Sequence, residues 1–280
     1  MKTKIFFTFV ISLLLIITAC SDSKSTEPEL KHANVVISLN APNEESVVGS
    51  VVTLTNNGGN HTIVYEQVAS SNSVVITDVV FGSYTLTVYL VGYSTYSNSN
   101  FSVQTATVNH SVTLRYYSIG DTGPGGGIIF YDKGDDQYGW RYLEAAPLSS
   151  EFIADWGAWT GNHEHMEWHD VPGTFTSIGT GKRNTVIIID RLKELGQTHR
   201  AAQLCNELNI NVCSDWFLPS KDELNKMYEQ KSIIGGFTND FYWSSSQSTI
   251  LYTWIQDFTN GYQDTYDKSG RYRVRAVRAF

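Results

Sequence analysis

The stretch DWFLPSKDEL, residues 215–224, decides the fold of the C-terminal part of this chain. Its second half has the pattern of a capping box, in which the Ser220 side chain accepts from the backbone N–H of Glu223 and the Glu223 side chain bonds back to the backbone of Ser220. Leu224 and Met227 follow at helical spacing. The stretch therefore predicts a helix that begins directly after Ser220.

More helices are expected upstream of this one, and short strands downstream. Apolar residues at helical spacing predict helices over 185–195 and 198–208. Runs rich in aromatic and β-branched residues predict strands over 242–246, 252–258 and 272–280. The C-terminal part is therefore expected to be a mixed α+β domain with a small antiparallel sheet.

Six ordered motifs give this part a resemblance to a known family. They are IGDTGPGGGIIFYDKG (119–134), GWRYLEAAP (139–147), IGTGKRNT (178–185), DWFLPSKDEL (215–224), YWSSS (242–246) and RVRAVRAF (273–280). Through them, residues 117–280 resemble the Lcl C-terminal-like domain family. The resemblance implies an α+β fold like that of C-type lectins and formylglycine-generating enzymes, displayed outside the cell. It also implies a lectin-like function, which in the best-described relative is the binding of sulfated polysaccharides.

Residues 34–116 have the composition of an all-β domain. They hold one basic residue and no Trp, and they are dense in Val, Thr, Ser and Tyr. Alternating runs predict the strands of a small sandwich, over 35–39, 50–55, 62–68, 74–80, 83–91 and 106–115. The run FGSYTLTV (81–88), followed by GY, resembles the PEGA and carboxypeptidase-regulatory-like sandwich domains. That resemblance implies a spacer or an adhesion stalk.

Residues 1–19 have the pattern of a lipoprotein signal peptide. Two lysines precede an apolar run that is short for a membrane span, and small residues stand before Cys20. We expect cleavage before Cys20 and attachment of lipid to it, with residues 20–33 as lipid anchor and polar tether. Because Ser21 rather than Asp follows the cysteine, the outer membrane of a bacterium is favoured, and the leaflet is left open.

The charge and the remaining cysteines narrow the environment further. Removal of the signal peptide takes two lysines away, so the formal net charge changes from -8 to -10. An acidic chain argues against nucleic acid as a partner. In an oxidising envelope, Cys205 and Cys213 are expected to form a disulfide. A metal-binding pair is the weaker alternative, because CxxC spacing is missing.

Aromatic residues in the expected loops are the main candidates for ligand binding, because Trp and Tyr rings stack on sugars and dominate protein contacts. The candidates are Trp156, Trp159, Trp168, Tyr252, Trp254, Tyr262 and Tyr266. The tryptophans inside the family motifs are instead assigned to the core. They are Trp140, Trp216 and Trp243.

The arginines near the C-terminus have two interpretations. Arg271 and Arg273 are candidates for a small basic ligand-binding patch on one face of a strand. Arg275 and Arg278 are expected to be internal, with hydrogen bonds to backbone carbonyls or to acids such as Asp215. The acidic charge of the whole domain opposes a polyanionic ligand.

Residues 162–170 hold three histidines and three acids, which makes them a weak candidate for a metal site. The histidines are His163, His165 and His169. The HExxH pattern is not satisfied, so a zinc-protease interpretation fails, and a solvated loop is favoured. No cofactor is expected, and a role for calcium in ordering the loops is left open.

The sequence indicates binding rather than chemistry. It contains no nucleophile motif or triad order in a supporting context, so the protein is not expected to be an enzyme. The leading interpretation is a surface or envelope lipoprotein with a lectin-like adhesin module for extracellular glycans or host matrix. The alternative is a structural envelope protein that acts through protein contacts.

Overall fold

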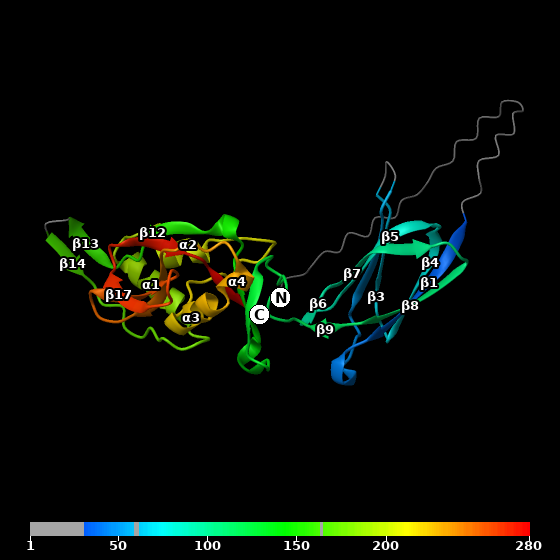
Figure 1. Cartoon of the computed structure of the whole chain (residues 1–280), viewed down its shortest axis with the longest axis horizontal. Coiled ribbons are helices and arrows are strands. Elements are labelled where there is room, and N and C mark those ends of the chain that lie inside the picture. The colour runs from blue at the N-terminus through cyan, green and yellow to red at the C-terminus, as the bar shows by residue number, and fades with distance from the viewer. Residues whose placement is uncertain (1–30, 59–61, 163–164) are drawn as a thin grey trace, which may run out of the picture.

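The computed structural model describes residues 31–58, 62–162 and 165–280. Strands hold 43% of the residues and helices 17%, so the molecule is mostly β. Figure 1 shows the sandwich strands at one end of the long axis, the α-helices at the other, and the C-terminus at the junction. The predicted signal peptide, the anchor at Cys20 and His163 lie outside the described residues.

The N-terminal part consists of two main sheets and a short ribbon. One sheet has the order β4-β1-β8 and the other β3-β2-β5-β7, and β6 pairs with β9. The strands are β1 (His32–Asn40), β2 (Val51–Asn56), β3 (Val64–Val68), β4 (Ser73–Val80), β5 (Gly82–Tyr89), β6 (Tyr93–Ser94), β7 (Tyr96–Val103), β8 (Thr107–Thr113) and β9 (Arg115–Tyr116), with a short helix η1 (Pro42–Glu44) after β1. Strand β1 runs antiparallel to β4 and parallel to β8.

Alternation of apolar and polar residues explains this sandwich. Val35 and Ile37 of β1 are fully buried, and so are Leu54 of β2 and Leu86 of β5, while their neighbours along each strand face outward. These side chains belong to one core cluster that joins the two sheets. The predicted strands are therefore present. Strand β7 was not predicted, because its polar sequence YSNSNFSV lacks the pattern.

Helices of the C-terminal part follow the predicted order. They are α1 (Gly181–Glu194), α2 (Ala201–Asn206), α3 (Lys221–Glu229) and α4 (Lys231–Ile234), of which α4 was not predicted. The capping box before α3 is confirmed, because the Glu223 N–H donates to Ser220 Oγ over 3.3 Å and the Ser220 N–H donates to Glu223 Oε2 over 2.6 Å. Glu223 also accepts from the N–H of Gly179. One buried carboxylate thus joins the start of α3 to the loop before α1.

Three sheets complete this part. Their orders are β10-β11-β19, β12-β18-β15-β16-β17 and the hairpin β13-β14. Their strands are β10 (Ile128–Asp132), β11 (Tyr142–Ala145), β12 (Phe152–Asp155), β13 (Trp159–Asn162), β14 (His165–Trp168), β15 (Phe241–Gln247), β16 (Tyr252–Asp257), β17 (Gln263–Asp267), β18 (Arg271–Val274) and β19 (Val277–Ala279), with short helices η2 (Gln137–Gly139) and η3 (Leu148–Ser150). The five-stranded sheet is mixed rather than antiparallel, because β15 and β18 are parallel.

The expected C-terminal strand is divided between two sheets, and its arginines explain why. Arg275 lies at the break, 2% exposed, and its guanidinium donates to Glu151 and to the carbonyls of Ala146 and Gly236. Arg278 is bonded to Asp215, as expected. A buried guanidinium is stable only where acceptors surround it. The break between β18 and β19 places Arg275 among such acceptors.

The expected disulfide is absent, since Cys205 and Cys213 are free thiols in the structure. Cys205 faces inward from α2, is fully buried in a cluster with Ala202 and Trp216, and acts there as a small apolar side chain. Burial raises the pKa of its thiol far above the usual range. The backbone of Cys213 instead forms an isolated antiparallel β-bridge with that of Ile210, across a tight turn.

Among the described residues, no helix has both the length and the apolar character needed to cross a bilayer.

Candidate functional site

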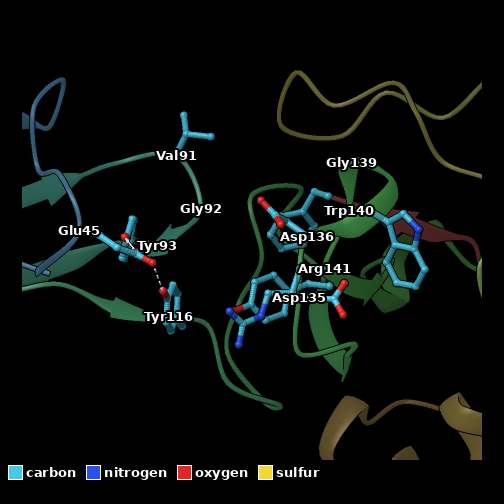
Figure 2. A pocket seen from close by; sticks show the side chains of 12 residues that line it. Glu45, Val91, Gly92, Tyr93, Tyr116, Asp135, Asp136, Gly139, Trp140 and Arg141 are labelled. Carbon is cyan, nitrogen blue, oxygen red and sulfur yellow. Dashed lines mark hydrogen bonds between the residues drawn. The ribbon is translucent and has the colours of Figure 1, made fainter. Parts of the chain in front are cut away.

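A pocket of about 540 Å³ lies where the sandwich meets the C-terminal part, and Figure 2 shows side chains from both. Its volume is within the range of roughly 300–1,000 Å³ that small-molecule sites occupy. The lining residues of the sandwich are Glu45, Val91, Gly92, Tyr93 and Tyr116. Those of the C-terminal part are Asp135, Asp136, Gly139, Trp140, Arg141, Tyr142 and Phe280.

The sandwich wall of the pocket is built around one carboxylate. Tyr93 and Tyr116 pair across the β6–β9 ribbon, and their rings stack with centroids 5.4 Å apart. Both hydroxyls donate to Glu45, that of Tyr116 over 2.6 Å. The hydrogen bonds from Tyr116 and Tyr93 lower the pKa of Glu45, while burial and Glu45 together raise the pKa of Tyr93. Glu45 is therefore a carboxylate with its geometry fixed before any ligand arrives.

Arg141 forms the opposite wall and touches both parts of the molecule. Its guanidinium carbon lies 4.4 Å from the centroid of the Tyr116 ring and 5.1 Å from that of Tyr142. The same group donates twice to Asp132, over 2.8 and 3.0 Å. Burial pushes the pKa of Asp132 upward, but the bonds from Arg141 and from the Gly134 N–H outweigh it and the pKa is lowered. Arg141 is thus held rigidly against the sandwich.

A lysine next to the pocket is held in the same manner. Lys133 Nζ donates to Asp135 over 2.6 Å and to the carbonyl of Gln137. It also lies 5.1 Å from the ring centroid of Trp140 and 5.7 Å from that of Tyr138. The hydrogen bond from Lys133 lowers the pKa of Asp135. Tyr138 itself is 84% exposed, so its ring remains open to solvent beside the pocket.

The arrangement suits recognition of a polar ligand. The faces of Tyr116 are covered by Tyr93 and Arg141, so the pocket offers ring edges, carboxylates and a guanidinium rather than a free stacking platform. Such groups donate to and accept from the hydroxyl and amino groups of a ligand. Because they come from both parts of the chain, the site depends on how the two parts meet.

The structure places the predicted aromatic candidates in three different environments. Trp156 is fully buried, and its indole N–H donates to the carbonyl of Ser244 over 2.9 Å, so its assignment to a ligand surface is wrong. Trp159 and Trp168 stand opposite each other in the β13–β14 hairpin, both half-buried. Trp254 is half-buried under the ammonium of Lys221.

The three tyrosines of this set are on the surface. Tyr252 is 43% exposed, Tyr262 65% and Tyr266 45%, all in or beside the β16–β17 hairpin. None of the aromatic candidates lines the pocket between the two parts. Trp216 and Trp243 are buried as expected, whereas Trp140 is half-buried and lines the pocket.

The two arginine candidates differ from each other. Arg271 is exposed at the start of β18. Arg273 is bonded to Glu151 and to Asp240, each over 3.0 Å. The charge of Arg273 is therefore paired with two acids, and the predicted basic patch is not formed.

Of the histidine candidates, His165 and His169 belong to the described residues, and these two do not form a metal site. His169 lies 2.9 Å from the Thr160 hydroxyl, and His165 is exposed. Across the described ranges, which leave out residues 163–164, no group of three or more His, Cys, Asp or Glu side chains is placed to hold a metal ion.

Sequence reasoning missed the pocket because its residues are scattered. Glu45, Tyr93, Tyr116, Arg141 and Phe280 share no local spacing. A usable signal was nonetheless present in the run YGWRY (138–142), which puts aromatic and basic residues into one short segment.

One family match covers much of the C-terminal part. Residues 157–278 match the Lcl C-terminal domain. The match confirms the resemblance over this range, which is narrower than the expected 117–280. Among curated proteins, none matches the chain.

Three solved structures resemble the chain distantly. A fimbrial protein from Bacteroides ovatus is 12% identical, with 89% of this chain and 71% of that chain covered and a TM-score of 0.43. The backbone protein of group B streptococcus pilus 2b is 16% identical, with 31% and 42% covered and a TM-score of 0.24. A minor pilin of Streptococcus agalactiae is 14% identical, with 32% and 46% covered and a TM-score of 0.25. Similarity at these scores carries no conclusion about fold or function.

Proposed function

We propose that the protein is a bacterial surface lipoprotein that binds an extracellular glycan in the pocket between its sandwich and its C-terminal part. Its function is binding rather than catalysis. The observation that carries the proposal is the pocket itself, with one wall fixed by Glu45, Tyr93 and Tyr116 and the other by Arg141. Groups held in place before binding lose little entropy when a ligand arrives, which favours affinity.

The remaining domain assignments form part of the same proposal. Lipid at Cys20 and a tether to residue 33 anchor the protein at the outer membrane. A PEGA-like sandwich over 34–116 serves as spacer, and a C-type-lectin-like α+β domain over 117–280 faces outward. The match to the Lcl C-terminal domain over 157–278 supports the last assignment.

A second location for the same function is the surface of the β16–β17 hairpin. Tyr252, Tyr262 and Tyr266 are exposed there, and Trp254 lies close by with Lys221 on its ring at 4.1 Å. Exposed tyrosine faces are suited to stacking on sugars. Lipid-free Trp254→Ala protein tests this location, because loss of glycan binding in it would move the site away from the pocket.

A structural role in the envelope is the competing proposal. It is favoured by β3, an edge strand on which Val64 and Val68 are each 53% exposed. An edge strand with apolar side chains offers unpaired backbone groups to a partner strand. Copurification of an envelope protein, together with no binding to any glycan on the panel, would favour this role.

The proposal is tested with the lipid-free protein, residues 21–280, on a glycan panel with and without calcium. A matched pair of variants locates the site. Val91→Trp adds bulk at a residue that lines the pocket and is 78% exposed, and Val75→Trp makes the same change on β4, where Val75 is 50% exposed. We expect saturable binding that Val91→Trp weakens about tenfold or more and Val75→Trp leaves unchanged.

Two further results would contradict the proposal. One is the absence of glycan binding by folded protein. The other is binding that the two tryptophan variants weaken equally. Binding that depends on calcium would add a metal ion to the bound state. Binding that does not depend on calcium would leave the side chains of the pocket as the recognition groups.

A further inference from the structure

A buried lysine lies against a side-chain amide in the C-terminal part. Lys268, in the turn between β17 and β18, is fully buried. Its Nζ donates to Gln247 Oε1 over 2.6 Å and to the backbone carbonyl of His169 over 3.0 Å. Both acceptors are neutral oxygens, and burial of an ammonium group without a bonded acid is unfavourable. The surroundings of Lys268 therefore favour its neutral amine.

The charge state of Lys268 agrees with these contacts. Burial lowers the pKa of Lys268 from its ordinary value of 10.5 to about 8, while the Asp170 charge opposes the shift and the Arg191 charge adds to it. The ring of Trp156, with its centroid 5.0 Å from Nζ, lies beside the amine. A neutral lysine amine is a nucleophile, and desolvation is one of the ways in which proteins activate it.

The amide of Gln247 is held on both sides. Its Oε1 accepts from the backbone N–H of Val171 over 2.9 Å as well as from Lys268, and its Nε2 donates to Asp170 Oδ1 over 2.5 Å. Because a carbonyl bond is about 1.23 Å long, the Cδ atom of Gln247 lies within about 3.8 Å of Nζ. A backbone N–H aimed at a carbonyl oxygen stabilises the negative charge that develops there during acyl transfer.

We propose that Lys268 and Gln247 join through an intramolecular isopeptide bond. The neutral Nζ attacks Cδ, so an N–C bond forms and the π electron pair of the carbonyl moves onto Oε1, where the Val171 N–H stabilises it. Both nitrogens are then bonded to one carbon, so the Asp170 carboxylate beside Nε2 can take a proton from the attacking nitrogen and give it to Nε2. The carbonyl re-forms, the Cδ–Nε2 bond breaks, and ammonia leaves.

The reaction is balanced without any further reagent. One amide is exchanged for another, one proton moves from Nζ to the departing nitrogen, and nothing is oxidised or reduced. Asp170 is exposed, so ammonia released on its side reaches solvent. Loss of ammonia into solvent makes the exchange effectively irreversible.

The bond would tie together segments that are distant along the chain. Gln247 is the last residue of β15, and Lys268 follows β17. A cross-link between them restricts the unfolded chain as a disulfide does. It would supply the covalent tie that the free thiols Cys205 and Cys213 do not form. This inference is independent of the proposed glycan binding.

The intact mass of the lipid-free protein, residues 21–280, is the first test. The folded protein is incubated at about pH 9, where the amine is mostly neutral because this pH lies above the pKa of Lys268. We expect a mass that is lower than that of the sequence by one ammonia. A folded protein that keeps the full mass of its sequence after this incubation would overturn the inference.

A peptide map locates the bond. Cyclisation of Asn57 or Asn260, each of which precedes a glycine, releases ammonia as well. The isopeptide bond is distinguished because trypsin no longer cleaves after Lys268. In addition, the segments with Gln247 and Lys268 stay linked after chymotrypsin cuts the aromatic-rich chain between them. Loss of ammonia with normal tryptic cleavage after Lys268 would overturn the inference.

A matched pair of variants tests the proton transfer. Asp170→Asn keeps the size of the side chain and removes the carboxylate, so ammonia loss should slow about a hundredfold or more. Asp264→Asn makes the same change at an exposed acid of β17 and should leave the rate unchanged. Circular dichroism verifies that both variants are folded. Equal rates in the two variants would contradict the part assigned to Asp170.

Discussion

The two parts of the molecule have different interiors. In the described residues of the sandwich, Ser50 and the hydroxyl groups of Tyr84 and Tyr93 are the polar groups of buried side chains, and no Asp, Glu, Lys or Arg is buried there. The C-terminal part buries Glu144, Glu223, Lys268 and Arg275 together with several serines and amides. The sandwich is thus specified by alternation along its strands, whereas the C-terminal part also depends on long-range polar bonds. Changes of charge should therefore affect the C-terminal part and leave the sandwich intact.

The largest effect is expected from Arg275→Ala. This change leaves Glu151, whose side chain is 5% exposed, with Arg273 as its one remaining ion-pair partner, and removes bonds to two backbone carbonyls. Breaking a buried pair costs about 3–5 kcal/mol, so unfolding in urea should begin at much lower concentration. Arg191→Ala, which removes a surface pair with Glu194 and one hydrogen bond to the carbonyl of Asp170, is the control and should cost about 1 kcal/mol or less. Equal losses would remove the contrast between the two interiors.

Leu54→Ala is the counterpart in the sandwich. Leu54 is fully buried between the sheets, and its truncation should cost about 3 kcal/mol in transfer and cavity energy. The loss should be the same at about pH 5 and about pH 8, because no ionisable group is involved. Val75→Ala, at a half-exposed position, should cost about 1 kcal/mol or less. A strong dependence of the Leu54→Ala loss on pH would contradict a purely apolar core.

Ser220→Ala tests the capping box before α3. Ser220 accepts from the Glu223 N–H and donates to the carbonyl of Ser177. Loss of an N-cap costs about 1–2 kcal/mol, measured as the free energy of unfolding in urea. Ser232→Ala, an exposed serine in α4, should change stability by about 0.5 kcal/mol or less. A Ser220→Ala protein as stable as the control would show that the cap is dispensable.

The smallest effect concerns Glu144 under the glycine loop. Burial raises the pKa of Glu144 from its ordinary value of 4.5 to about 7, although the Arg278 charge and the Gly125 N–H oppose the shift. Between these values the folded protein binds the proton more tightly than the unfolded chain. The contribution of Glu144 to stability is therefore present below pH 4.5 and lost as the pH rises through about 7.

Glu144→Gln removes this dependence. Relative to the unmodified protein, the variant should gain about 1 kcal/mol between pH 6 and pH 7 in urea unfolding. Burial also raises the pKa of Glu223 to about 7, but Glu223 is present in both proteins and cancels in the comparison. A constant difference between the two proteins over this pH range would contradict the role of Glu144.

Short sequence patterns correctly predicted the features that depend on residues close together in the chain. The capping box located the start of α3, and alternation located most of the sandwich strands, because each depends on residues close in sequence. Trp156 was assigned to a loop surface and is buried, because a loop can lead directly into a core. The prediction of a disulfide was wrong for a similar reason, because the spacing of the two cysteines does not show that Cys205 faces inward.

The pocket is the clearest case of a feature that sequence spacing could not give. Glu45 and Tyr116 are 71 positions apart and meet only because the sandwich folds around them. Arg141 reaches Tyr116 only because the two parts of the chain meet at the β6–β9 ribbon. Such a site is defined by tertiary packing, and no short motif encodes it.

Hydrogen exchange with and without a glycan that binds on the panel tests the central claim most directly. Ligand in the pocket should slow exchange in peptides that cover residues 89–95, 113–118 and 135–142, which lie on both sides of the junction. The β16–β17 hairpin should exchange at its original rate. Protection confined to that hairpin, with the junction unchanged, would contradict the account and place the binding surface on the exposed tyrosines instead.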